Sequence, residues 1–121
     1  KDLRGFIGFA GPYDFLPVAS DDVRSIAALG AIETYADTQP INFVDNTDPP
    51  AFLAVSPTDT TVNPKNTLRF AQKIRDVGSS VEEHSYDGVD HVTILGSLGR
   101  ASRFLNEAVL GDLLEFLTAN E

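Results

Sequence analysis

Residues 51–92, AFLAVSPTDTTVNPKNTLRFAQKIRDVGSSVEEHSYDGVDHV, carry the pattern that decides the fold. Two short runs rich in β-branched and aromatic residues, 51–55 and 81–86, are predicted to be strands. The first run is apolar at consecutive positions, which is typical of a strand covered on both faces of a parallel sheet. The second run carries more charge, so we expect it nearer an edge of that sheet.

The residues between these strands predict a helix with clear ends. Asn63 suits the N-cap, Pro64 the first helical position, and Gly78 the left-handed residue just past the last turn. An apolar stripe at three- and four-residue spacing is expected to face the sheet: Leu68, Phe70, Ala71, Ile74 and Val77. Strand, helix and strand together predict a β-helix-β unit of an α/β protein.

The connection of this unit places two polar side chains at one edge of the sheet. Such crossovers are almost always right-handed, so the two strands run parallel and the loops after them open on the same side. Asp59 lies in the first loop and His91 in the second, and we expect them to meet where open α/β sheets bind ligands. An Asp that accepts a bond from one imidazole nitrogen leaves the other free to take a proton from a nucleophile.

Each of these residues also has a structural interpretation. Asp59 alone suits a turn in which its carboxylate accepts backbone N–H bonds, and His91 alone suits a surface loop. His84 is predicted to be a solvent-facing strand residue. The set His84, Asp87, Asp90 and His91 matches no recognised ligand spacing, so no metal is expected.

The rest of the chain is predicted to complete a single domain, 1–121. A strand is expected from Gly5 to Phe9, and a last helix from about Ser102 to Ala119. The inward face of that helix is expected to hold Leu105, Val109, Leu113, Phe116 and Leu117. Residues 16–48 contain a short helix capped by Ser20 and ending at Gly30, and they are interpreted as a cap-like excursion lying over the sheet.

Composition excludes several classes of function. The 121 residues include 18 acidic and 9 basic side chains, giving a net charge of -9, and 42% are hydrophobic, which describes one soluble globular domain. With no Lys/Arg cluster, the acidic surplus repels phosphate backbones and anionic lipids, so neither nucleic acid nor a membrane is an expected partner. Cys is absent, which excludes disulfides, thiolate zinc sites and a cysteine nucleophile. Cysteine usage leaves the compartment open, with the cytoplasm favoured.

No cofactor is expected either. Gly5, Gly8 and Gly11 have neither the dinucleotide-binding spacing nor that of a P-loop. A phosphate-binding doubly wound domain therefore remains only a weak alternative.

Five motifs follow one another along the chain: Gly-Pro-Tyr-Asp-Phe at 11–15, Pro-Ile-Asn-Phe-Val at 40–44, Asp-Pro-Pro at 48–50, Asp-Thr-Thr-Val-Asn-Pro-Lys-Asn-Thr at 59–67 and Tyr-Asp-Gly-Val-Asp-His-Val-Thr-Ile-Leu at 86–95. Their order, and the distance from acid to histidine, resemble the C-terminal half of an α/β-hydrolase of the carboxylesterase and kynurenine-formamidase-like group. The resemblance covers nearly the whole chain. It implies a partial α/β-hydrolase fold of about three parallel strands flanked by helices, with Asp59 as the triad acid and His91 as the triad base.

The sequence departs from that family in two places. Val55-Ser56 stands where the family commonly has His-Gly, just before the acid loop. The Gly-x-Ser-x-Gly motif of the nucleophile and the glycine-rich oxyanion loop are both missing from the 121 residues. We therefore expect the chain to be a piece of a longer protein whose N-terminal part carries the serine.

These features are compatible with two functions of the chain. The first is the acid-base half of a serine hydrolase that cleaves carboxylic esters or small amides and is inactive by itself. Phe15, Leu16, Phe43 and Val44 are its candidate acyl-pocket residues, with an ordinary core position as the alternative for each. The second is a non-catalytic binding or assembly domain that keeps the fold.

Association is expected of such a part of a hydrolase. A strand from Gly5 to Phe9 without its second neighbour exposes unpaired backbone groups. This edge predicts a homodimer, or pairing with an N-terminal fragment.

Overall fold

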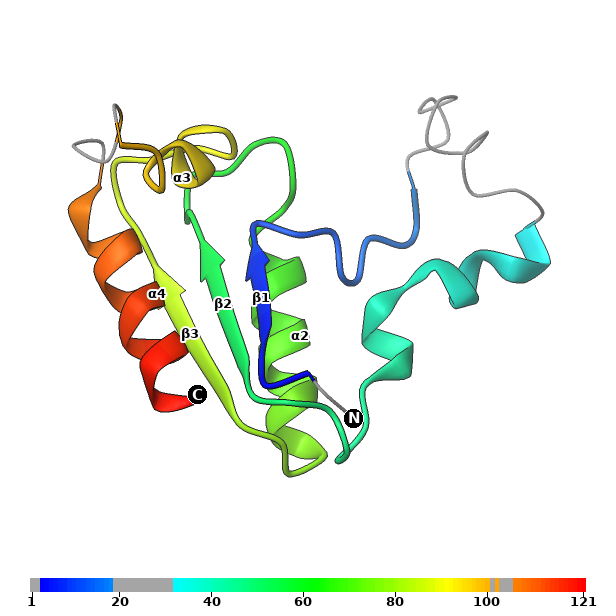
Figure 1. Ribbon diagram of the computed structural model, residues 1–121. Coiled ribbons are helices and arrows are strands. Elements are labelled where there is room, and N and C mark those ends of the chain that lie inside the picture. Colours follow the sequence, from blue (N-terminus) through cyan, green and yellow to red (C-terminus); the bar gives the residue numbers. More distant parts are fainter. Residues whose placement is uncertain (1–2, 19–31, 101, 103–105) are drawn as a thin grey trace.

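The computed structural model describes residues 3–18, 32–100, 102 and 106–121. Within them, β1 (Phe6–Phe9), β2 (Ala51–Val55) and β3 (Val81–Ser85) form one parallel sheet in the order β1-β2-β3 (Figure 1). Ala51 pairs with Phe6 on one side and with Val81 on the other. The expected three parallel strands are confirmed, and the charged strand β3 lies at an edge as predicted.

The central strand β2 is buried along its whole length because helices cover both faces of the sheet (Figure 1). Ala51 and Leu53 pack toward α2 (Lys65–Asp76) on one face. Phe52 and Ala54 pack with residues of α4 (Glu107–Ala119) on the other. This double coverage explains why β2 is apolar at consecutive positions.

The local signal at the C-terminal end of α2 is confirmed, whereas the N-cap is Pro64, one residue later than predicted. Asn63 Oδ1 accepts the N–H of Lys65, which satisfies a free donor of the first turn. Gly78 has φ +87°, and the N–H of Ser79 donates to the carbonyl of Ile74, which closes the helix in a Schellman motif.

One member of the predicted stripe on α2 is wrong. Leu68 is exposed, whereas Thr67, Phe70, Ala71 and Ile74 are buried. Positions 67, 70, 71 and 74 share one helical face, and position 68 lies about 100° around the axis from 67. The face that meets the sheet is therefore the predicted one, with Thr67 buried in place of Leu68.

The last helix is shorter than expected. It begins at Glu107, where Asn106 is the N-cap and its side chain accepts the N–H of Ala108. Val109 and Phe116 are buried as predicted, and Leu113 packs against them. The other two predicted inward residues differ: Leu117 is exposed, because it lies off the face that meets the sheet, and Leu105 lies outside the described residues.

The described part of the expected excursion packs at the α2 side of the sheet, where Ile41 and Val44 contact the core that includes Ala51 and Leu53. Residues 20–30, with the predicted short helix, lie outside the described residues. The following turns, η1 (Ile32–Thr38) and η2 (Pro40–Phe43), lie beside β1 and α2 and not above the upper ends of the strands (Figure 1). The buried Gln39 anchors them, because its Oε1 accepts the N–H groups of Phe15 and Leu16.

In the described residues, α3 (Thr93–Gly96) is a further helix of a single turn, which follows the third strand. No helix in the described part of the chain is long and apolar enough to span a bilayer.

Candidate active site

The carboxyl ends of β2 and β3 bring Asp59 and His91 together. Each residue lies in the loop that follows its strand, at the upper edge of the sheet in Figure 1. His91 Nδ1 lies 2.9 Å from Asp59 Oδ2, so the ring N–H can donate to the carboxylate. The expected juxtaposition of these two side chains is confirmed.

The second oxygen of Asp59 explains why the carboxylate keeps this orientation. Its Oδ1 accepts the N–H of Thr61 at 2.7 Å and the N–H of Val62 at 2.9 Å. Asp59 is therefore also the turn residue that the structural interpretation described. The turn and the imidazole contact use different oxygens, so both interpretations hold at once.

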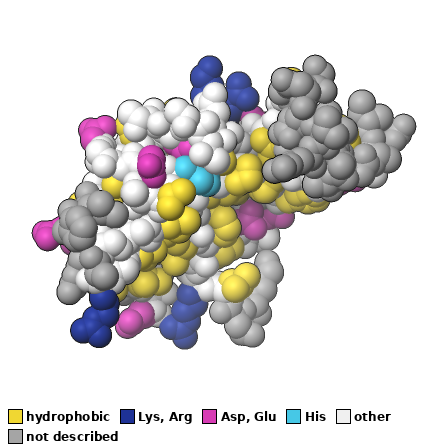
Figure 2. Space-filling view, turned by 90° about the horizontal axis from the view of Figure 1, so that it is seen from above, with side chains coloured by type: hydrophobic (Ala, Val, Ile, Leu, Met, Phe, Trp, Pro, Cys, Tyr) yellow, Lys and Arg dark blue, Asp and Glu magenta, His cyan; other side chains and the backbone are white. Residues whose placement is uncertain are grey.

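The two partners differ in exposure. The Asp59 side chain has no exposed surface, whereas that of His91 keeps 29%. The imidazole is thus anchored from below by a buried carboxylate and remains accessible from outside. Figure 2 shows imidazole surface next to hydrophobic side chains on this upper side of the molecule.

The environment of Asp59 keeps its carboxylate ionised. Burial acts to raise the pKa of Asp59, but hydrogen bonds from Val62, His91 and Thr61 outweigh it, so that the pKa lies below its ordinary value. A buried carboxylate that stays negative can fix the imidazole tautomer and stabilise the imidazolium form.

The loop that carries His91 is held on its far side by Asp90. Asp90 Oδ1 accepts the N–H groups of Val92 and Thr93 at the start of α3. These bonds, with Thr93 contributing most, lower the pKa of Asp90. Ile94 of α3 is fully buried in the core, which anchors the loop further.

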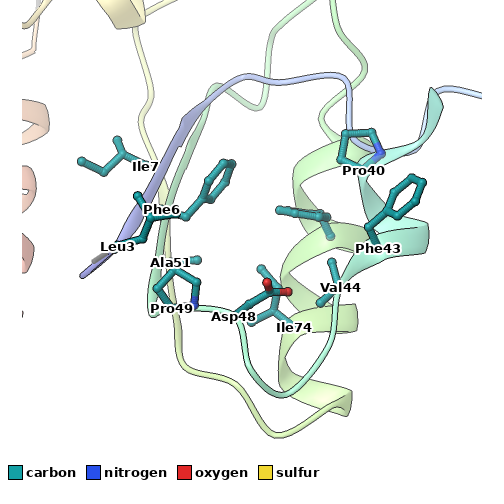
Figure 3. A pocket seen from close by; sticks show the side chains of 12 residues that line it. Leu3, Phe6, Ile7, Pro40, Phe43, Val44, Asp48, Pro49, Ala51 and Ile74 are labelled. Atoms are coloured by element: carbon teal, nitrogen blue, oxygen red, sulfur yellow. The ribbon is translucent and has the colours of Figure 1, made fainter. Parts of the chain in front are cut away.

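The predicted acyl-pocket residues do not gather around the pair. Phe43 and Val44 line a groove of about 420 Å³. In this groove, Pro40 and Phe43 lie on the side opposite Phe6 (Figure 3). This groove includes Ala51, the first residue of β2, whereas Asp59 follows the end of the same strand. The predicted set is therefore split, because the chain from 40 to 44 packs near the amino ends of the strands.

Phe15 and Leu16 follow the carboxyl end of β1, where Gln39 holds their backbone N–H groups. Their role in substrate binding stays a prediction.

The sequence interpretation missed the environment of His84. Its ring stacks on Phe52 at a centroid distance of 4.7 Å, and its Nδ1 lies 3.3 Å from Asp112 Oδ2 in α4. Tyr86 donates to the same carboxylate oxygen, and burial with this contact raises the pKa of Tyr86. The two-residue alternation from Tyr86 back to His84 was the available signal, because it places both rings on the α4 face.

His84 is therefore partly covered by α4, although 28% of its side chain stays exposed, so the expected solvent-facing position holds only in part. In the described residues, no cluster of three or more His, Asp or Glu side chains could hold a metal ion.

The arrangement of strands and helices matches solved esterases. Esterase 2 of Thermogutta terrifontis gives a TM-score of 0.72 at 20% identity, over 96% of this chain and 42% of that chain. A truncated carbohydrate esterase from gut microbiota gives 0.76 at 19% identity, over 98% of this chain and 42% of the other. The carboxylesterase Cest-2923 of Lactobacillus plantarum gives 0.75 at 16% identity, over 96% and 44%. The fold is thus the C-terminal part of an α/β-hydrolase.

The sequence defines the family within this class. The model of the prolyl oligopeptidase family matches residues 21–119, and the chain belongs to that family. A comparison with curated proteins gave no match. The chain spans less than half of the length of the three esterases, so it corresponds to only part of such a structure.

Proposed function

We propose that Asp59 and His91 are the acid and base of a serine hydrolase that cleaves carboxylic esters or small amides. The observation that carries this proposal is the 2.9 Å contact between His91 Nδ1 and a fully buried Asp59 carboxylate beside an accessible imidazole. Membership of a hydrolase family supports the same role.

The proposed chemistry divides between this chain and a serine outside it. His91 Nε2 takes the proton of the serine hydroxyl while the serine oxygen bonds to the substrate carbonyl carbon. Asp59 stabilises the imidazolium that forms, and the imidazolium then gives its proton to the leaving alcohol or amine. Water repeats the sequence on the acyl-enzyme and releases the acid.

The 121 residues contain no Gly-x-Ser-x-Gly motif, so the chain by itself is proposed to be inactive. Without a nucleophile the imidazole can activate only water. The absence of an oxyanion hole also removes about 3 to 4 kcal/mol of transition-state stabilisation, which is the contribution of one such hydrogen-bond donor.

The test uses a longer form of the protein, or a complementing N-terminal segment, that supplies the serine motif. His91→Ala is expected to lower kcat/KM for a short-chain ester about 10⁴-fold, because the serine loses its base. His84→Gln is the matched control, since it changes the other histidine and leaves the proposed machinery intact. An active enzyme that is indifferent to His91→Ala would refute the assignment.

The second candidate, a non-catalytic assembly domain, is favoured by a different observation. Leu3, Phe6 and Ile7 are exposed at the outer side of β1, which in the described residues has a strand partner on one side only. A longer protein that contains the serine motif and folds, yet hydrolyses no ester or amide, would favour this candidate.

A further inference from the structure

Two hydroxyl groups join the loop of Asp59 to the loop of His91. Ser56 Oγ donates to the backbone carbonyl of Val89 at 2.5 Å. Thr58 Oγ1 lies 3.4 Å from the same carbonyl oxygen and 3.1 Å from Ser56 Oγ. Both hydroxyls belong to the segment between the end of β2 and Asp59, and both converge on the segment just before His91.

The position of these bonds in the chain makes them relevant to the pair. Ser56 is three residues before Asp59, and its carbonyl accepts the N–H of Asp59. Val89 is two residues before His91, and its side chain is buried in the core. The Ser56 hydroxyl therefore connects the two loops by their backbone, a few residues before the positions of Asp59 and His91.

The bond lies away from water. Ser56 has no exposed surface, and Val89 keeps only 4%. Without the Ser56 hydroxyl, the buried carbonyl of Val89 would keep only the more distant Thr58 hydroxyl at 3.4 Å, so the chain would move to recover a closer partner. Because His91 is two residues away, such a movement changes the distance between His91 and Asp59.

We propose that Ser56 is a positioning residue that sets the geometry of the Asp59–His91 pair. This inference rests on the proposed function of that pair. Ser56 does not act as the nucleophile, because its hydroxyl is fully buried and donates to a backbone carbonyl. It acts through the Val89 carbonyl and touches no reacting atom.

The test compares Ser56→Ala, Ser56→Thr and Ser56→Cys in the complete, active protein. Ser56→Ala is expected to lower kcat about 10- to 100-fold with KM little changed, because a displaced base impairs proton transfer and leaves ground-state binding intact. Ser56→Thr keeps the hydroxyl and is expected to retain most of kcat. Ser56→Cys keeps the volume with a weaker donor, and is expected to fall between the two.

Ser79→Ala is the matched control. Its hydroxyl also donates to a distant backbone carbonyl, that of Asp45, at 3.2 Å, and the bond spans 34 positions against 33 for Ser56 and Val89. It follows α2 at the other end of the sheet, so its loss should leave kcat unchanged.

A second readout does not depend on turnover. The ring N–H proton that His91 donates to Asp59 can be followed by NMR, and its exchange with water should be faster in Ser56→Ala than in Ser56→Thr. If Ser56→Ala folds poorly, proton exchange is compared between Ser56→Cys and Ser56→Thr instead.

The outcomes separate the two proposals. If His91→Ala abolishes activity while Ser56→Ala and Ser56→Cys keep the parent kcat and proton exchange, Ser56 has no positioning role. Equal losses in Ser56→Ala and Ser56→Thr would also overturn it. If His91→Ala leaves activity unchanged, the proposed function itself fails.

Discussion

Gly8 is the residue at which β1 allows the closest approach of another side chain. A Cβ at this position would overlap the hydroxyl oxygen of Tyr13 and come within 3.0 Å of Leu53 Cδ2. Tyr13 cannot easily withdraw, because its ring stacks on Phe70 at 4.4 Å and is buried. The same burial raises the pKa of Tyr13 to about 12, so the hydroxyl stays neutral under ordinary conditions.

Gly8→Ala is expected to destabilise the protein by about 1–3 kcal/mol through overpacking. Urea unfolding measures the change. Tyr13→Phe removes the overlapping oxygen, so the double variant should lose less stability than the sum of the two single variants. Strict additivity would contradict the predicted overlap.

Asp59 is expected to make stability depend on pH in the acid range. Its folded-state pKa lies below the unfolded value of about 3.9, so its contribution is present above that value and is lost as the pH falls through the folded pKa. The free energy of unfolding should therefore decrease on acidification below about pH 4–5.

Asp59→Asn tests that dependence, because it removes the titrating group and keeps an oxygen for the turn. The slope of the unfolding free energy against pH should become smaller in this range than in the parent. Asp76→Asn, at the exposed end of α2, removes the same charge from the surface and serves as the control. Equal slopes in the parent and Asp59→Asn would contradict the prediction.

At the scale of the elements, two glycines with empty surroundings should respond to alanine in opposite ways. A Cβ at Gly78 or at Gly111 would meet no atom within 4 Å. Gly78 has φ +87° at the end of α2, whereas Gly111 lies inside α4. Only backbone conformation therefore distinguishes the two sites.

Gly111→Ala is expected to stabilise the protein by about 0.5–1 kcal/mol, because alanine favours a helix interior. Gly78→Ala is expected to destabilise it by about 1–2 kcal/mol, because an L-residue is strained in the left-handed region. Thermal unfolding of both variants checks the signs. The same sign for both would show that conformation does not control these positions.

At the scale of the molecule, the outer edge of β1 predicts association. Phe6 and Ile7 are 39% and 40% exposed, and an apolar strand edge is a template for pairing with another strand. We expect the 121-residue chain to form a dimer at micromolar concentration, measured by sedimentation, or to take up an N-terminal segment that supplies the neighbouring strand.

Ile7→Lys should reduce this association, because a charge on an edge strand opposes pairing. Leu117→Lys introduces the same charge at a residue of similar exposure, 43%, on α4, and is expected to leave association unchanged. A stable monomer of the parent chain would contradict the prediction.

The contact between Asp59 and His91 could be predicted because it depends on topology more than on packing. A β-helix-β unit with a right-handed crossover places both loops at the same edge, whatever the side chains between them. The positions of Phe43 and Val44 had no such constraint. They lie in the long connection between β1 and β2, whose described residues form no strand, and the groove that they line is formed with residues of β1, β2 and α2.

The sequence by itself determined the features that arise from local interactions: the three strands, the end of α2 at Gly78, and the chain order that carries Asp59 and His91 to one edge. Tertiary structure alone decided that Thr67 and not Leu68 faces the sheet, that Asp112 of α4 contacts His84, and that Ser56 bonds to Val89. The physical reason is the separation along the chain over which each interaction acts. Caps and periodicity act between residues a few positions apart, whereas burial and cross-loop hydrogen bonds depend on elements that meet only when the chain has folded.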